Sequence, residues 1–263
     1  MLQQILNHKR TAVQERKRLV PESLLKSLPY FNRQCHSLRE RLLARPGRAV
    51  IAEFKRRSPS NPRINPDAGL ARVVSGYVQA GAVAVSVLTD EQYFGGSLDD
   101  LRQARKLVDV PLLRKDFIID SYQLFEAKAY GADAVLLIGA ALSAGEAKEL
   151  ATLAHELGME VLLEIHNRQE WDQYRHTNAD ITGVNNRNLN TLQTNVDNSV
   201  ELAKVFSPDV VRISESGLKH PSTALQLASL GYTGFLIGEH FMSQADPVKA
   251  CADFINALDN DQL

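Results

Sequence analysis

The sequence predicts a single α/β domain in which eight parallel strands close into a barrel ringed by helices, with an N-terminal helical extension. Three observations support this: eight short apolar runs, helical patterning in most gaps between them, and glycines that end the helices. The runs are nearly continuously apolar, as expected of a parallel sheet buried on both faces. They are AVIAEFK (49–55), AVAVSVLT (82–89), PLLRKD (111–116), AVLLIG (134–139), EVLLEI (160–165), ITGVNN (181–186), VVRISES (210–216) and GFLIGE (234–239).

The ends of the predicted helices are marked by residues with a physical reason to be there. Glycine adopts the left-handed conformation that turns a helix back to the sheet, and four glycines precede strands in this way: Gly81, Gly131, Gly158 and Gly231. Helix starts are expected at Ser97, Ser143 and Asp246-Pro247. An open doubly wound sheet would also alternate strands and helices. The absence of G-x-G-x-x-G after the first run, and eight units of similar length, favour the barrel.

The expected domain comprises residues 1–263, with an extension over 1–47 and the barrel over 48–263. The extension is predicted to be helical to about residue 45, and its apolar positions are Leu2, Ile5, Leu6 and Val13. Arg45-Pro46-Gly47 should end it. The basic run HKRTAVQERKR (8–18) could be a nucleic-acid-binding arm, but we interpret it as a solvated helix face.

Composition limits the classes of function. With 30 Lys and Arg against 31 Asp and Glu, the net charge is −1, which argues against nucleic-acid or membrane-surface binding driven by bulk charge. No apolar stretch has the length of a membrane-spanning helix, and the N-terminus has no apolar signal core. We therefore expect a cytoplasmic protein, with Cys35 and Cys251 as reduced thiols.

Polar residues follow the apolar parts of the predicted strands at the end where barrel active sites lie. Positions i and i+2 of a strand share a face, so these polar residues share a face with an apolar residue two positions earlier. If those faces point inward, the polar side chains converge at one mouth of the barrel. Buried ions persist only if paired or useful, and mutual pairing would shift their pKa values as acid and base chemistry requires. The candidates are Glu53, Lys55, Lys115, Glu164, Asn185, Arg187 and Glu215.

An anion site is expected beside this cluster. Ser216-Gly217 follows the seventh strand and Gly238-Glu239 the eighth, where barrels often bind phosphate through backbone N–H groups. The loop KRRSPSNPR (55–63) adds Ser58 and nearby cations. No metal site is predicted, because the seven histidines have no ligand spacing. His166 is interpreted as a loop residue rather than a base.

Several segments together resemble the indole-3-glycerol phosphate synthase family: AEFKRRSPS (52–60), SVLTDEQYFGGSLDDL (86–101), LLRKDFIID (112–120), ITGVNNRNL (181–189), SESGL (214–218) and FLIGEHFM (235–242). The resemblance covers residues 50–243, and the TIM barrel with its N-terminal extension also fits this family. It implies a phosphosugar substrate, 1-(2-carboxyphenylamino)-1-deoxyribulose 5-phosphate, and no metal or organic cofactor. The ring carbon that bears the carboxylate attacks the ribulose carbonyl, CO₂ leaves, and water is lost to form the indole.

The resemblance also implies roles. Lys115 is similar to the family's general acid, and a cationic, partly desolvated site would lower its pKa. Lys55 would hold the substrate carboxylate and serve as a second acid in dehydration, while Glu164 would stabilise the iminium charge and assist proton removal. Glu53 and Glu215 would orient the lysines and the substrate hydroxyls. The remaining assignments are a polar wall of Asn185 and Arg187, a phosphate cradle of Ser58, Ser216, Gly217, Gly238 and Glu239, and an apolar pocket of Phe94 and Leu137, with Leu189 as a weaker candidate.

One departure from the family and several alternatives stay open at this point. The family commonly has lysine and glycine after SPS, where this chain has Asn61-Pro62-Arg63, so we expect catalysis to be retained with a different rate of loop movement. The residues alone also allow a ketose isomerase of the same pathway, a non-catalytic phosphate-binding barrel, or a Schiff-base aldolase that uses Lys115. Association with other enzymes of tryptophan biosynthesis is left open.

Overall fold

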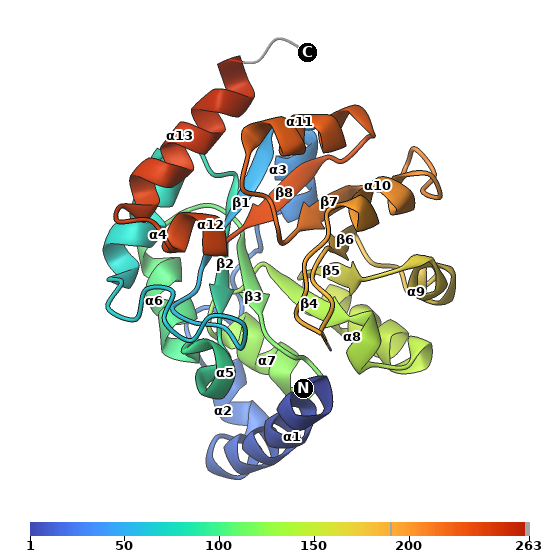
Figure 1. Ribbon diagram of the computed structural model, residues 1–263. Helices are drawn as coiled ribbons and strands as arrows, with labels where there is room; N and C mark the ends of the chain where they lie inside the picture. Colours follow the sequence, from blue (N-terminus) through green and yellow to red (C-terminus); the bar gives the residue numbers. More distant parts are fainter. Residues whose placement is uncertain (190, 261–263) are drawn as a thin grey trace.

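Eight parallel strands pair in chain order and close on themselves, since β8 also pairs with β1 (Figure 1). The computed structural model describes residues 1–189 and 191–260; residues 261–263, the end of the predicted domain, lie outside this description. All eight predicted strands are confirmed, and the closed order excludes the open doubly wound sheet. They are β1 (Ala49–Phe54), β2 (Ala84–Leu88), β3 (Leu112–Lys115), β4 (Ala134–Ile138), β5 (Glu160–Ile165), β6 (Ile181–Asn185), β7 (Arg212–Glu215) and β8 (Gly234–Ile237).

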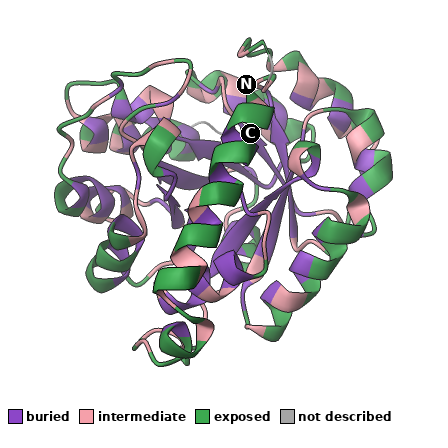
Figure 2. Ribbon diagram, turned by 90° about the horizontal axis from the view of Figure 1, so that it is seen from below, coloured by how far each residue is buried: buried purple, intermediate pink, exposed green. Residues whose placement is uncertain are grey.

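Helices surround the strands, with buried inner faces and exposed outer faces (Figure 2). They are α1 (Leu2–Leu19), α2 (Glu22–Lys26), α3 (Leu38–Leu43), α4 (Leu70–Gln79), α5 (Glu91–Phe94), α6 (Leu98–Leu107), α7 (Tyr122–Ala129), α8 (Ala144–Glu156), α9 (Arg168–Tyr174), α10 (Asp197–Ala203), α11 (Pro221–Ser229), α12 (Glu239–Met242) and α13 (Pro247–Asn260), with a 3₁₀ turn, η1 (Gly139–Ala141).

The strands divide the apolar core into two layers, as their alternation requires. Inside the barrel, Ile51, Leu113, Leu162 and Ile213 belong to one cluster. The larger cluster lies between the strands and the outer helices and contains residues such as Phe54. The predicted inward positions below Glu53, Lys115, Glu164 and Glu215 are therefore confirmed, and the polar residues two positions later share their faces.

The predicted helix ends are confirmed. Gly81, Gly131, Gly158 and Gly231 have φ of 99°, 93°, 75° and 89°, in the left-handed region. Ser97 accepts a hydrogen bond from the backbone of Asp100, and Ser143 forms a reciprocal capping box with Glu146 at the start of α8.

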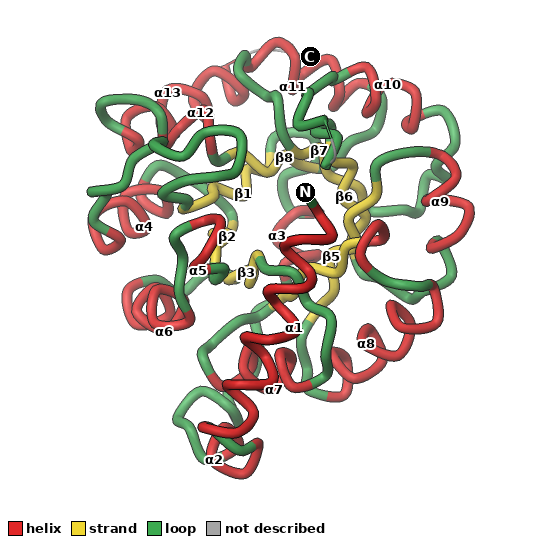
Figure 3. The backbone as a smooth tube through the Cα atoms, turned by 60° about the horizontal axis from the view of Figure 1, so that its bottom comes forward, coloured by secondary structure: helices red, strands yellow, loops and turns green. Residues whose placement is uncertain are grey.

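The N-terminal extension differs from the predicted continuous helix. Three helices form, and the segment 27–37 between α2 and α3 is not helical. α3 closes one end of the barrel, where Leu38 and Leu42 are fully buried in the interior cluster. α1 crosses the other end, and its N-terminus lies over the ring of strands (Figure 3). Pro21 is the N-cap of α2 and Pro29 lies in the non-helical segment, and a proline disfavours the helical conformation of the residue before it.

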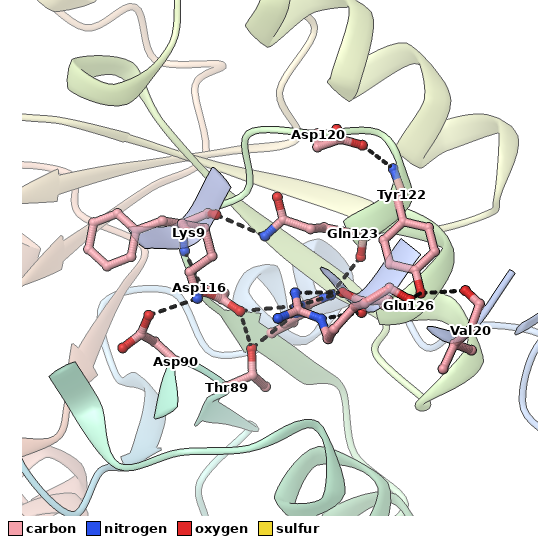
Figure 4. Close-up of polar contacts among 12 residues, drawn as sticks. Lys9, Val20, Thr89, Asp90, Asp116, Asp120, Tyr122, Gln123 and Glu126 are labelled. Atoms are coloured by element: carbon pink, nitrogen blue, oxygen red, sulfur yellow. Dashed lines mark hydrogen bonds and ion pairs between the residues drawn. The ribbon is translucent and has the colours of Figure 1, made fainter. Parts of the chain in front are cut away.

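The basic run of α1 is only partly the solvated face that we predicted: His8, Arg10 and Arg18 are exposed, but Lys9 is buried. Lys9 is only 4% exposed, and its Nζ lies 2.7 Å from Asp90 Oδ2 and 2.6 Å from Asp116 Oδ1 (Figure 4). Farther along α1, Arg16 pairs with Glu126 and Lys17 with Asp120. Acidic residues of the barrel therefore fix α1, a set of partners that the charge pattern of α1 alone does not show.

Candidate active site

A cavity of about 700 Å³ opens where the carboxyl ends of the strands meet, under the start of α1. Met1, Leu2 and Ile5 of α1 contribute to its wall. All candidate residues but one line it: Glu53, Lys55, Ser58, Phe94, Lys115, Glu164, Asn185, Arg187, Glu215, Ser216, Gly217, Gly238 and Glu239, together with Leu189. The structure thus brings residues from seven of the eight strands, or from the segments that follow them, to one place.

Lys115 lies at the centre of the cluster, between two carboxylates. Its Nζ lies 3.1 Å from Glu164 Oε2 and 2.5 Å from Glu215 Oε2, so it joins β3 to β5 and β7. All three side chains are largely buried, with exposures of 12%, 3% and 2%. Removal of either carboxylate would leave the ammonium group with a weaker counter-charge in a desolvated setting.

The electrostatics around Lys115 correct the expected direction of its pKa. Burial alone would lower it, but Glu215, Glu164 and Glu53 together raise the pKa above its usual value. The prediction assumed a cationic site, whereas three carboxylates surround this ammonium group. Lys115 is therefore protonated at neutral pH, the state that a general acid requires.

The pKa values of the two carboxyls beside Lys115 shift in opposite directions. Burial raises the pKa of Glu215 to about 7, because the attraction of Lys115 is opposed by repulsion from Glu164. Burial also acts on Glu164, but Lys115, His166 and a hydrogen bond from Asn185 outweigh it and lower the pKa. Two neighbouring carboxyls with opposite shifts allow one to stay ionised while the other exchanges a proton near neutral pH.

Glu53 and Lys55 form a second ion pair in the wall of the cavity. Lys55 Nζ donates to Glu53 Oε1 at 2.6 Å, and Ser86 Oγ donates to Glu53 Oε2 at 3.4 Å. Glu53 Oε1 occupies this position only because residue 238, directly after β8, is glycine. A Cβ at Gly238 would lie 2.4 Å from Glu53 Oε1. Gly183 makes room in the same way for Glu215 Oε1, which would lie 2.1 Å from a Cβ.

Arg187 ties three loops together at the rim. Its guanidinium donates to Ser60 Oγ at 2.9 Å and to Glu239 Oε2 at 3.0 Å, and its backbone N–H donates to Asn185 Oδ1 at 2.9 Å. The loops after β1, β6 and β8 are thereby held in one arrangement. The loop after β1 is also closed by paired backbone hydrogen bonds between Ser58 and Asn61.

The predicted anion-binding turns have unusual backbone conformations. Ser216 and Gly217 have φ of 67° and 78°, so two successive residues of the left-handed region follow β7. A Cβ at Gly217 would lie 2.6 Å from the Thr194 side chain. Glycine is required there both by φ and by space, while Ser216 tolerates a conformation that is strained for most residues.

The apolar residues that line the cavity differ from the prediction at one position and include others that were not predicted. Leu137 is fully buried in the cluster between strands and helices, and does not line the cavity. Its neighbours Leu136 and Ile138 do line it, with Leu236 and Phe117. The run AVLLIG is apolar on both faces, so only its register could identify the inner one: Ala134 pairs with the inward-facing Leu113, so positions 134, 136 and 138 point inward.

A buried network behind the site joins α1 to β3 (Figure 4). Thr89 Oγ1 donates to Asp116 Oδ2 at 2.6 Å, and Arg114 Nη2 donates to the same oxygen at 3.0 Å. Burial would raise the pKa of Asp116, but the contacts with Lys9, Arg114 and Thr89 outweigh burial and lower it. Asp116 directly follows Lys115, so α1 supports the chain at the end of β3 that carries this candidate residue.

Among residues 1–189 and 191–260, no group of three or more His, Cys, Asp or Glu side chains has an arrangement suited to a metal ion. In the same part of the chain, no helix combines the length and apolarity needed to span a membrane. The expectation of a reaction without metal or organic cofactor stays a prediction.

Comparison with known proteins identifies the family of this chain. A family model described as indole-3-glycerol phosphate synthase matches residues 2–254. A curated relative of that name from Bacteroides thetaiotaomicron is 52% identical over 219 residues, 83% of this chain and 84% of its own length. Another from Salinibacter ruber is 41% identical over 252 residues, 95% of this chain and 93% of its own. A thiamine phosphate pyrophosphorylase structure from Pyrococcus furiosus, at 14% identity, covers 82% of this chain and 98% of its own with a TM-score of 0.61, which shows the fold alone. This chain belongs to the indole-3-glycerol phosphate synthase family.

Proposed function

We propose that the chain performs the family's reaction with Lys115 as the general acid of ring closure. The chain is a carboxy-lyase of tryptophan biosynthesis. It converts 1-(2-carboxyphenylamino)-1-deoxyribulose 5-phosphate to indole-3-glycerol phosphate, CO₂ and water. The observation that carries the role of Lys115 is its position between Glu164 and Glu215, which keep it protonated in a largely buried site.

Ring closure begins when the ring carbon that bears the carboxylate attacks the ribulose carbonyl. The carbonyl oxygen gains negative charge, and Lys115 donates a proton to it. The ring nitrogen then carries the positive charge of an iminium ion. The ionised Glu164 stabilises that charge, because its carboxylate is held in the same cavity by Lys115 and Asn185.

The later steps use the second pair. Lys55 binds the aryl carboxylate until CO₂ leaves, and then protonates the hydroxyl that departs as water. Glu53 orients the Lys55 ammonium group, which regains its proton from solvent. Glu215, whose pKa of about 7 lets it exchange protons near neutral pH, orients the sugar hydroxyls and Lys115. Glu164 assists the removal of the ring proton that completes the indole.

Phosphate binding is assigned to the rim of the cavity. Ser58 and the turns at Ser216-Gly217 and Gly238-Glu239 line this part of the cavity, and Arg187 supplies a cation that contacts both Ser60 and Glu239. Asn185 and Arg187 complete the polar wall. Phe94, Leu136 and Leu236 provide the apolar surface for the aromatic ring, with Leu189 beside them.

Further proposals concern the setting of the enzyme. We expect one functional unit in which residues 1–47 cover both ends of the barrel formed by residues 48–263, acting in the cytoplasm without nucleic-acid or membrane partners. Association with other enzymes of tryptophan biosynthesis is not required by the site, which contains every group used above.

The experiment is a conversion assay with the purified chain and the carboxyphenylamino-deoxyribulose phosphate. Indole-glycerol phosphate is followed by its fluorescence, and CO₂ release is measured in parallel. Equal amounts of both products are expected, and the Glu164→Gln variant should lose at least tenfold in kcat with a smaller change in KM. Isomerised sugar without CO₂ release would favour the ketose isomerase, and borohydride inactivation with substrate would favour a Schiff base at Lys115. Binding without any turnover would contradict the assignment.

A further inference from the structure

A histidine that the sequence suggested to be an ordinary loop residue lies against the back of the active site. His166 directly follows β5 and does not line the cavity, and its side chain is 12% exposed. Its Nε2 is fully buried without a hydrogen bond and lies 3.4 Å from Glu164 Oε1. The other oxygen of that carboxylate, Oε2, lies 3.1 Å from Lys115 Nζ. Glu164 is therefore held from both sides, with an ammonium group at one oxygen and an imidazole at the other.

The imidazole is itself fixed by the first turn of α9. Glu170 Oε2 lies 3.2 Å from His166 Nδ1 and accepts a hydrogen bond from the His166 backbone at 2.8 Å. Glu170 is in turn held by the N-cap residue Asn167, whose Oδ1 accepts from the Glu170 backbone at 2.9 Å and whose Nδ2 donates to Glu170 Oε1 at 3.1 Å. A carboxylate at Nδ1 fixes the ring orientation and favours the protonated ring, which directs an N–H at Nε2 toward Glu164.

We propose that His166 is a positioning residue for the reaction: anchored by Glu170, it holds the Glu164 carboxylate in place and keeps it ionised. This inference rests on the proposed role of Glu164 as the anion beside the developing iminium charge. The reacting atoms are touched by Glu164, and His166 acts only through it.

The charges around the imidazole favour its protonated form. Burial lowers the pKa of His166, but the contacts with Glu170 and Glu164 outweigh burial and raise it above its usual value, with a further contribution from Glu215. These three carboxylates come from α9, β5 and β7. Tyr174 of α9, a neutral phenol, also interacts electrostatically with Glu170. Lys115 contacts the other oxygen of Glu164. In return, His166 is the second-largest cause that lowers the pKa of Glu164, after Lys115.

An electrostatic role of His166 and a merely structural one predict different dependences of activity on pH. If His166 keeps Glu164 ionised, its loss raises the pKa of the Glu164–Glu215 pair, so activity falls most at low pH. The acidic limb of the kcat/KM profile should then move upward by about one pH unit, the lower end of what an opposite charge at this distance causes. A purely structural role would lower activity by the same factor at every pH.

The test compares pH profiles of kcat/KM for the parent, His166→Asn, His166→Gln and Glu170→Gln. Parent turnover, measured first, decides whether the proposed function holds. The control is His155→Asn, which removes a similar histidine–carboxylate pair on α8, 2.8 Å from Asp180 and away from the cavity. We expect an upward shift of the acidic limb for His166→Asn, with at least a tenfold loss below the limb and less than threefold at pH 8. The His155→Asn profile should match the parent.

The other two variants keep the proposal falsifiable if His166→Asn fails to fold. His166→Gln retains an N–H donor but no charge, so it should recover activity at pH 8 while its limb stays shifted. Glu170→Gln retains the hydrogen bond from the His166 backbone but weakens protonation of the ring, so it should shift the limb in the same direction by less. Profiles parallel to that of the parent in all three variants, whatever their absolute rates, would overturn the proposal.

Discussion

Gly183→Ala tests whether the placement of Glu215 limits catalysis. Gly183 lies in β6, opposite Ile213 of β7, and a Cβ there would lie only 2.1 Å from Glu215 Oε1. Contacts of Cβ atoms below 3.0 Å essentially never occur, so the carboxylate must move by at least 0.9 Å, the difference between these two distances. Its other oxygen makes the 2.5 Å contact with Lys115 Nζ, so the same movement weakens the support of the proposed general acid.

The expected loss follows from that displacement. A misplacement of about 1 Å in a catalytic group costs about 10²-fold in rate, so kcat/KM should fall by about two orders of magnitude. The assay is the initial rate of indole-glycerol phosphate formation, with urea unfolding to confirm that the variant is folded. Gly69→Ala is the matched control, because a Cβ at Gly69 would meet nothing within 4 Å. A folded Gly183→Ala protein with kcat/KM within threefold of the parent would refute the reasoning.

Three other predictions concern stability, pH dependence and the apolar wall. Lys9→Met leaves Asp90 and Asp116 without their shared cation, so we expect a loss of about 3–5 kcal/mol in the free energy of unfolding, measured by urea titration at pH 7; a change below 1 kcal/mol would contradict this. Glu215 binds its proton more tightly in the folded chain, where its pKa is about 7, than in the unfolded chain, so its contribution to stability decreases as pH rises from about 4.5 to 7. Glu215→Gln should therefore gain stability relative to the parent between pH 5 and pH 8, and the opposite trend in thermal melts would be inconsistent with the raised pKa. Leu136→Ala should raise KM, whereas Leu137→Ala should leave KM unchanged and cost about 2–5 kcal/mol of stability; equal effects of the two on KM would be contrary evidence.

The barrel and most of the site could be predicted because both depend on local patterns. A buried parallel strand needs an apolar run of limited length. In this chain the residues of the candidate site follow those runs directly, as Lys115 follows Leu113 at the i+2 position. At the end of β1, polar and apolar residues alternate over Glu53, Phe54 and Lys55, which indicated that Glu53 and Lys55 share one face. Helix ends were equally local, since Ser143 and Gly158 act through the backbone of their own helix.

The rest depends on contacts between segments that are distant in sequence. The inner face of β4 could not be chosen, because Leu136 and Leu137 are equally apolar and only pairing with β3 distinguishes them. The partners of Lys9 lie 81 and 107 residues away along the chain, as the numbers of Asp90 and Asp116 show. The direction of the pKa shift of Lys115 was wrong for the same reason, since the net charge around it depends on which carboxylates the fold brings close.

The central claim is that Lys115, held between Glu164 and Glu215, protonates the carbonyl oxygen during ring closure. Its most direct test is single-turnover formation of indole-glycerol phosphate by Lys115→Met, beside a direct measurement of substrate affinity. The account predicts a rate at least 10²–10⁴-fold below that of the parent, the range that general acid catalysis supplies, with affinity changed less than tenfold. A folded Lys115→Met protein that closes the ring within tenfold of the parent rate would contradict it.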